Sequence, residues 1–179
     1  SYEDRLHAAI TVNPDALKIA DERDRERAQG KVRGPLHGIP IALKDNIHTT
    51  DMRTTGGALA FEHLVPPYDA TLTKNLRDAG AIIVAKANLG EMGTPNSRSS
   101  FGGPFCNPYD TERSPGTSSG GSGASVGASL VTCAIGEETG VRYPINALRR
   151  LRRLGLAENT EAGWALTPAG ESRRAEGGA

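Results

Sequence analysis

The sequence predicts an α/β fold in which a mostly parallel sheet is flanked by helices. Three observations support this prediction. Short apolar runs alternate with helix-like segments, two of those segments end at a glycine, and a loop rich in glycine and serine precedes the last apolar run. A length of 179 residues suits one compact domain. The composition changes after residue 144, so we expect a folded domain over residues 1–144 and a helical or irregular tail over residues 145–179.

The first helix is predicted over the stretch NPDALKIADERDRERAQG. Asn13 and Pro14 supply an N-cap and a first helical residue, Leu17 and Ala20 recur at helical spacing, and Gly30 ends the helix. The apolar run GIPIALKDN then predicts a buried strand that ends near a lysine.

The second helix and strand repeat this pattern. In DATLTKNLRDAG, Asp69 is the expected N-cap, Leu72 and Leu76 lie on one helical face, and Gly80 ends the helix. The run AIIVAK that follows predicts a second buried strand, ending at Lys86.

The third helix and strand come after a long connection. Residues 91–117 are rich in proline and glycine and predict a long ordered loop. The stretch GSGASVGASLV predicts a helix of small residues packed closely on the sheet, and TCAIG predicts a third strand with Cys133 as a small core residue.

Composition excludes several classes of function. The 21 basic and 21 acidic residues balance, so no overall charge favours nucleic acid or a membrane surface. The sequence has no apolar run long enough for a transmembrane helix and no leader resembling a signal peptide. Cys106 and Cys133 form no CxxC pair. We therefore expect a cytoplasmic protein that does not bind a membrane.

The serine-rich loop fits neither of two common motifs. Residues 116–120 match the G-x-S-x-G nucleophile elbow, but every histidine precedes Ser118 and the last aspartate is Asp110, so the order of a hydrolase triad is not available. A phosphate-binding loop needs a lysine after its last glycine, and the last lysine of the chain is Lys86.

The remaining possibility is a serine that is activated by a lysine. A lysine acts as a base when burial or a neighbouring positive charge leaves its amine neutral. Lys44 ends the strand IPIAL, and ligand sites in open α/β sheets gather at such carboxyl ends of strands. Lys86 ends AIIVA in the same way and is the second candidate. The other lysines are expected on solvated surfaces: Lys18, Lys31 and Lys74.

Several stretches together resemble the amidase signature family. They are GPLHGIPIALKDNI, TTGGALAF, DATLTKNLRDAGAIIVAKANLGEM, NPYD and SPGTSSGGSGASV…AIGEETG, in that order, from about residue 12 to Gly140. The resemblance implies part of the amidase-signature fold. It also implies hydrolysis of the C–N bond of a small-molecule carboxamide by a Ser-cisSer-Lys triad, without a metal or an organic cofactor.

The resemblance assigns roles to individual residues. Lys44 in ALKDN matches the family's base. Ser118, the first serine of SSGGS, matches the bridging serine, which is expected before a cis peptide bond. The oxyanion hole and substrate loop are implied at Thr139, Gly140 and Val141.

The chain departs from the family at the nucleophile. The family has a serine in a GGSIR-like or GVSIR-like segment, whereas this sequence continues from Gly140 as Val-Arg-Tyr-Pro. Without a gap Arg142 takes the place of the serine, and with a two-residue gap the serine is deleted. Family members are also several times longer on the C-terminal side. We therefore expect a truncated or rearranged amidase without turnover, with an inactive remnant as the alternative.

The tail suggests a further alternative. ALRRLRRLGLAENTEAGWALTPAG resembles the last helix and wing of winged-helix regulators, so a chimera that binds nucleic acid through arginines is considered. Leu148, Leu151 and Leu154 predict a short amphipathic helix, and the last ten residues predict a disordered end. The predicted three-strand sheet leaves an open edge through which the chain can associate with another.

Overall fold

The structure is a computed structural model that describes residues 3–137, 157–160 and 163–166. The chain forms two compact units, residues 1–139 and residues 140–179. The described part of the second unit is an antiparallel hairpin of β7 (Ala157–Thr160) and β8 (Gly163–Leu166). The predicted amphipathic helix at 148–154 and the disordered end lie outside the described residues.

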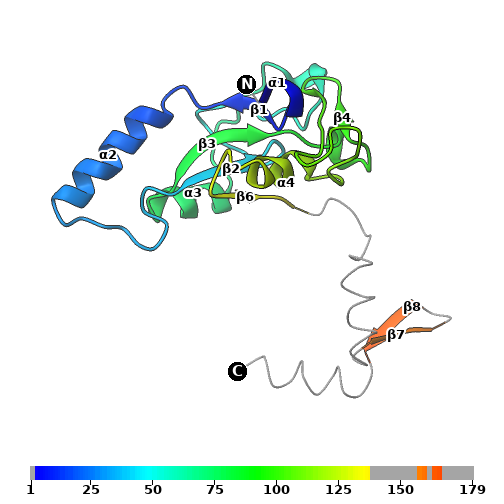
Figure 1. Cartoon of the computed structure of the whole chain (residues 1–179). Coiled ribbons are helices and arrows are strands. Elements are labelled where there is room, and N and C mark those ends of the chain that lie inside the picture. The colour runs from blue at the N-terminus through cyan, green and yellow to red at the C-terminus, as the bar shows by residue number, and fades with distance from the viewer. Residues whose placement is uncertain (1–2, 138–156, 161–162, 167–179) are drawn as a thin grey trace. The chain divides into compact units, whose positions relative to one another are not determined.

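A four-stranded sheet in the order β1-β3-β2-β6 forms the centre of the first unit (Figure 1). The three predicted strands are β2 (Pro40–Lys44), β3 (Ile82–Ala87) and β6 (Cys133–Ile135), and they are parallel, which confirms the predicted fold class. The sequence did not predict β1 (Ala9–Val12), which pairs antiparallel with β3. This strand is only four residues long and half-exposed at the edge, so its apolar pattern is weak.

Four helices accompany the sheet in the first unit: α1 (Glu3–Leu6), α2 (Ala16–Ala28), α3 (Thr71–Asp78) and α4 (Gly120–Gly127). Short 3-10 turns η1 (Leu59–Phe61) and η2 (Glu91–Gly93) lie in loops, and β4 (Arg98–Ser99) pairs with β5 (Gly103–Pro104) inside the long connection. The helix α2 extends beyond one end of the sheet (Figure 1). The helix α4 packs against β2 and β6.

The two faces of the sheet are packed differently. Ile41, Leu43 and Ile83 point to the face that Leu76 of α3 covers, where they form a hydrophobic cluster. Ala42 and Ala85 point to the opposite face, where alanines form a second cluster. Because side chains alternate along a strand, the side chain of Lys44, the next residue, points to the alanine face.

A β-bulge decides which residues of β2 and β3 lie side by side. Ile41 pairs with Ile83, but the next residue of β2 pairs with Ala85, so Val84 is an extra residue without a partner on β2. The shift places Leu43 opposite Lys86. Without it, Lys44 would lie opposite Lys86.

Two predicted helix starts are wrong. The helix α2 begins at Ala16 with Asp15 as its N-cap. The Asn13 side chain accepts a hydrogen bond from the Asp15 amide at 2.9 Å and donates to the Ile83 carbonyl of β3 at 2.8 Å. A side chain that is held on β3 in this way leaves Asp15 in the capping position.

The predicted cap of α3 is also occupied elsewhere. Asp69 accepts a hydrogen bond from the Thr50 amide at 2.8 Å and pairs with the Arg77 guanidinium at 3.0 Å, and Ala70 is the N-cap. Of the two leucines expected on one face, Leu76 is buried and Leu72 is 41% exposed.

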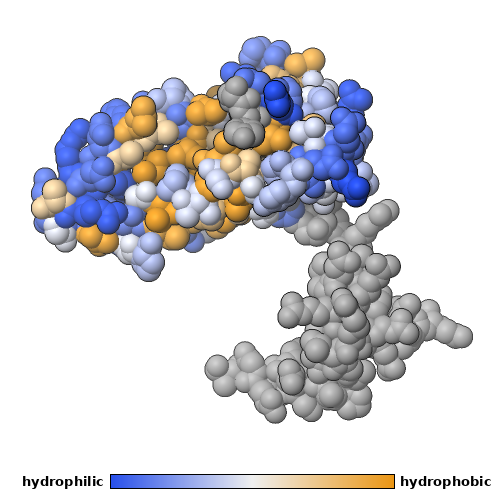
Figure 2. Space-filling view, in the orientation of Figure 1, coloured by the Kyte–Doolittle hydropathy of each residue, from blue (hydrophilic) through white to orange (hydrophobic). Residues whose placement is uncertain are grey.

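The predicted helix ends are confirmed. Gly30 and Gly80 follow α2 and α3 with φ of +73° and +85°, and each donates its N–H to the last turn. Figure 2 shows hydrophilic side chains over α2 and hydrophobic side chains gathered over the middle of the same face, where Figure 1 places the sheet. Within the described residues, no helix has the length and apolar character needed to cross a membrane.

Candidate active site

Lys44 is the last residue of β2, and its side chain is completely buried on the alanine face of the sheet. Its Nζ donates hydrogen bonds to the Ser118 hydroxyl at 2.7 Å and to the Glu137 carbonyl at 2.8 Å. The structure therefore brings together the two residues that the sequence singled out as base and bridging serine, 74 positions apart.

Ser118 lies in the loop that leads into α4, and it is 6% exposed. The Gly90 amide donates to its carbonyl at 2.9 Å, so the loop after β3 fixes its backbone. The cis peptide bond joins Thr117 to Ser118. The expectation that Ser118 stands before the cis bond is wrong, because the cis bond precedes it.

The small residues of α4 let its first turn approach the rest of the site. A Cβ atom on Gly121 would stand 2.3 Å from the Asn88 carbonyl oxygen and 2.6 Å from the Ala8 carbonyl oxygen. The Gly121 amide donates to that Asn88 oxygen at 3.0 Å. Glycine is therefore required here for contact between the start of the helix and the end of β3.

Glu137 is a site residue that the sequence did not single out. Its Oε1 accepts a hydrogen bond from the Asn46 side chain at 2.8 Å and lies 3.7 Å from Lys44 Nζ. A carboxylate at this distance favours the protonated form of an amine. The glutamate is visible in the motif EETG, but its contact with a lysine 93 residues earlier depends on the fold.

Lys86, the second candidate for the base, has other partners. Its Nζ lies 3.3 Å from Asp45 Oδ1, donates to Thr54 Oγ1 at 2.7 Å and donates to the Arg53 carbonyl at 3.1 Å. Burial lowers the pKa of Lys86 below its usual 10.5, and the Asp45 carboxylate opposes this effect. The bulge in β3 places Lys86 on the face opposite to Lys44, so its environment is that of a structural ion pair.

The other expected site residues, Thr139, Gly140, Val141 and Arg142, lie outside the described residues. Over residues 3–137, 157–160 and 163–166, no three His, Cys, Asp or Glu side chains gather as a metal ion requires.

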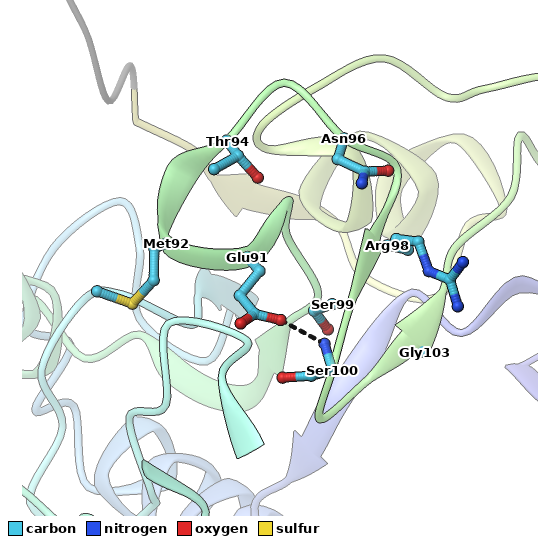
Figure 3. A pocket seen from close by; sticks show the side chains of 8 residues that line it. All are labelled: Glu91, Met92, Thr94, Asn96, Arg98, Ser99, Ser100 and Gly103. Atoms are coloured by element: carbon cyan, nitrogen blue, oxygen red, sulfur yellow. Dashed lines mark hydrogen bonds between the residues drawn. The ribbon is translucent and has the colours of Figure 1, made fainter. Parts of the chain in front are cut away.

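A pocket of about 600 Å³ opens beside the turn that follows β3 (Figure 3). Its lining includes Glu91 and Met92 from the turn after β3 and Arg98 from β4. The Glu91 carboxylate accepts a hydrogen bond from the Ser100 amide at 2.6 Å, which ties the two sides of the pocket together. The lining does not include Lys44 or Ser118, so the pocket does not contain this pair.

We expect the Glu91 contact to weaken in acid. Hydrogen bonds from Ser100 hold the pKa of Glu91 below its usual 4.5. Because the folded carboxyl has the lower pKa, its contribution to stability is present above 4.5 and is lost as the pH falls through the folded pKa. NMR titration should give a midpoint below 4.5 for the Glu91 carboxyl, together with a shift of the Ser100 amide proton. A midpoint at or above 4.5 would contradict this.

Comparisons with known proteins identify the family. The amidase family profile matches residues 1–144. A glutamyl-tRNA(Gln) amidotransferase subunit from Natranaerobius thermophilus is 48% identical over 149 residues, which cover 79% of this chain and 30% of that protein. The structure of native peptide amidase from Stenotrophomonas maltophilia shares 45% identity and a TM-score of 0.70 over 74% of this chain and 30% of that chain. The corresponding amidotransferase subunit from Thermotoga maritima shares 38% identity and a TM-score of 0.62 over 75% of this chain and 27% of that chain.

The matches cover most of this chain but only part of each relative. The chain spans about 30% of the length of the curated relatives it matches. The family profile ends at residue 144, and the similarity of the tail to winged-helix regulators gains no support from these comparisons. The profile covers most of the chain, and the matched structures share its α/β core. The chain therefore belongs to the amidase signature family.

Proposed function

We propose that Lys44 and Ser118 are the base and the bridging serine of a site for cleaving carboxamide C–N bonds. The observation that carries this proposal is the 2.7 Å hydrogen bond between Lys44 Nζ and Ser118 Oγ, made by a completely buried lysine. Membership in the amidase signature family supports the reaction class.

The proposed proton path runs through both side chains. Neutral Lys44 accepts the hydroxyl proton of Ser118, and Ser118 Oγ accepts the proton of the attacking hydroxyl group, so one proton reaches Nζ for each attack. The backbone N–H groups of Thr139 and Gly140 are proposed to stabilise the oxyanion. A donor of this kind contributes about 3 kcal/mol to the transition state.

The relatives support a proposed substrate class. They include a peptide amidase and a subunit of glutamyl-tRNA(Gln) amidotransferase, so a peptide carboxamide or the side-chain amide of glutamine is the proposed small-molecule substrate. Residues 1–144 are the proposed amidase domain and residues 145–179 the separate tail.

We also propose that this chain does not complete the reaction by itself. Arg142 stands where the family has its attacking serine, or the serine is deleted next to it. An arginine side chain remains protonated in proteins, so it has no lone pair with which to attack a carbonyl carbon.

Ammonia release tests this proposal. The purified chain is expected to release no ammonia above the buffer rate from glutamine or from peptide carboxamides. Turnover that disappears in Lys44→Ala would show that the chain is an active amidase and would overturn the proposed inactivity.

A second variant tests the roles of Lys44 and Ser118. Insertion of Gly-Ser between Gly140 and Val141 restores a GGSVR segment. A fluorophosphonate is expected to label the inserted serine, and the labelling is expected to be lost when Lys44→Met or Ser118→Ala is added. Labelling of the inserted serine that survives both changes would contradict the proton path.

A further inference from the structure

We propose that Ser118 is itself a nucleophile in this chain and accepts the acyl group of small activated esters, such as aryl esters. This inference rests on the proposed role of Lys44 as a base. It assigns Ser118 a reaction that a bridging serine does not perform, with a different class of substrate.

The contacts of Lys44 fit proton transfer from Ser118. Among the described residues, Nζ meets the Ser118 hydroxyl at 2.7 Å, the Glu137 carbonyl at 2.8 Å and Glu137 Oε1 at 3.7 Å. A neutral amine has two N–H donors and one lone pair. With one N–H donated to the Glu137 carbonyl, the lone pair of a neutral amine at this distance can accept the Ser118 hydroxyl proton.

The neighbouring serines are engaged in a different way. The Ser119 hydroxyl donates to the Glu137 carbonyl at 2.9 Å, and the Ser122 hydroxyl donates to the Ile135 carbonyl at 3.1 Å. A carbonyl oxygen takes a hydrogen bond but does not remove the proton. Of these three hydroxyl groups, that of Ser118 is the one that faces an amine.

The surroundings favour negative charge on Ser118 Oγ. Ser118 is 6% exposed, so water screens its interactions little. The helix α4 begins two residues later, at Gly120, and the N-terminal end of a helix stabilises nearby negative charge. The helix N-terminus adds to the effect of Lys44 on Ser118, and the hydrogen bond with Lys44 remains the main observation.

The reaction balances with the groups present. Ser118 Oγ attacks the ester carbonyl carbon while its proton moves to Lys44 Nζ, and the bond from that carbon to the aryl oxygen breaks. The phenolate leaves with the electron pair, and the acyl group remains as an ester on Ser118. A phenolate departs without a proton, whereas the nitrogen of an amide must be protonated to leave, which is why esters are the proposed class.

The Glu137 carboxylate provides a second test of the same reaction. It lies 3.7 Å from Lys44 Nζ, and a negative charge at this place opposes loss of a proton from the amine. The nearby Asp45 carboxylate pairs with Lys86 on the other face of the sheet. Glu137→Gln removes the charge near Lys44 and is expected to speed the reaction of Ser118.

Labelling of the full chain with a fluorophosphonate tests the inference. Mass spectrometry of the digested protein is expected to place the adduct on Ser118. The labelling rate should fall about 100-fold in Lys44→Met, rise in Glu137→Gln, and stay at the wild-type value in Ser122→Ala, a buried serine in the helix that follows. The rate of aryl acetate hydrolysis should change in the same direction as the labelling rate in each of these variants.

The outcomes separate this inference from the proposed function. An adduct on another serine or no adduct on the folded wild type overturns the inference, and neither outcome depends on whether Lys44→Met folds. An unchanged rate in Glu137→Gln overturns the proposed effect of that carboxylate. Suppose that the inserted serine of the Gly-Ser variant is labelled and Ser118 of the wild type is not. The proton path through Ser118 to Lys44 is then supported, and the role of Ser118 as a nucleophile is rejected. If neither serine is labelled, the role of Lys44 as base fails as well.

Discussion

Asp45→Asn is expected to lower the free energy of unfolding by about 3–5 kcal/mol, because it leaves the buried Lys86 ammonium without a counter-charge. Both side chains are completely buried, with 3.3 Å between Asp45 Oδ1 and Lys86 Nζ. The Asp45 carboxylate also accepts a hydrogen bond from the Thr55 amide at 3.0 Å, so the substitution weakens a network that holds the loop after β2.

Urea unfolding followed by circular dichroism measures this effect. Adding Lys86→Met to Asp45→Asn should recover part of the loss, since the unpaired buried charge is then absent. The loss in the single variant should also shrink as the pH rises towards 10.5, the usual pKa of lysine, because the unfolded chain holds the proton more tightly than the fold. Asp78→Asn, which breaks the exposed pair with Lys74, is the control and should leave stability unchanged. An equally small effect of Asp45→Asn would contradict the prediction.

Gly121→Ala is expected to destabilise the domain by about 3 kcal/mol, the upper part of the range for overpacking a close contact. The added Cβ would stand 2.3 Å from the Asn88 carbonyl oxygen and 2.6 Å from the Ala8 carbonyl oxygen. Both are backbone atoms, so neither can move aside by changing a rotamer. The helix α4 would have to shift away from β1 and β3, and Ser118 would move with it.

Gly123→Ala in the same helix is the matched control. A Cβ at this position meets no atom within 4 Å, and alanine is favoured over glycine in a helix by about 1 kcal/mol. Thermal unfolding should therefore show a lower midpoint for Gly121→Ala and an equal or higher one for Gly123→Ala. Equal midpoints for the two variants would show that the first turn of α4 is not packed as described.

The sequence predicted the parts of the fold that have strong local signals. The apolar runs that became β2, β3 and β6 were recognisable because buried parallel strands are apolar on both faces. Gly30 and Gly80 marked helix ends because their positive φ suits glycine. The helix α4 was predicted from its small residues, and the structure shows that these residues permit a close approach of backbones.

Other parts depended on contacts that local signals do not reveal. Asn13 and Asp69 have the residue types of helix caps, but each is held by a partner from a distant segment. The short edge strand β1 gains its order from pairing with β3. Glu137 reaches Lys44 only because β6 pairs in parallel with β2 and brings their carboxyl ends together.

The choice between the two candidate lysines shows most clearly what local sequence signals do not predict. The sequence determined that a lysine ends each of two buried strands and that a serine loop follows, which was enough to propose a serine activated by a lysine. The tertiary structure decided which lysine faces the serine. The extra residue Val84 shifts the register, and because side chains alternate along a strand, a shift of one residue moves the following side chains to the other face. Lys44 therefore meets Ser118, and Lys86 meets Asp45 on the opposite side of the sheet.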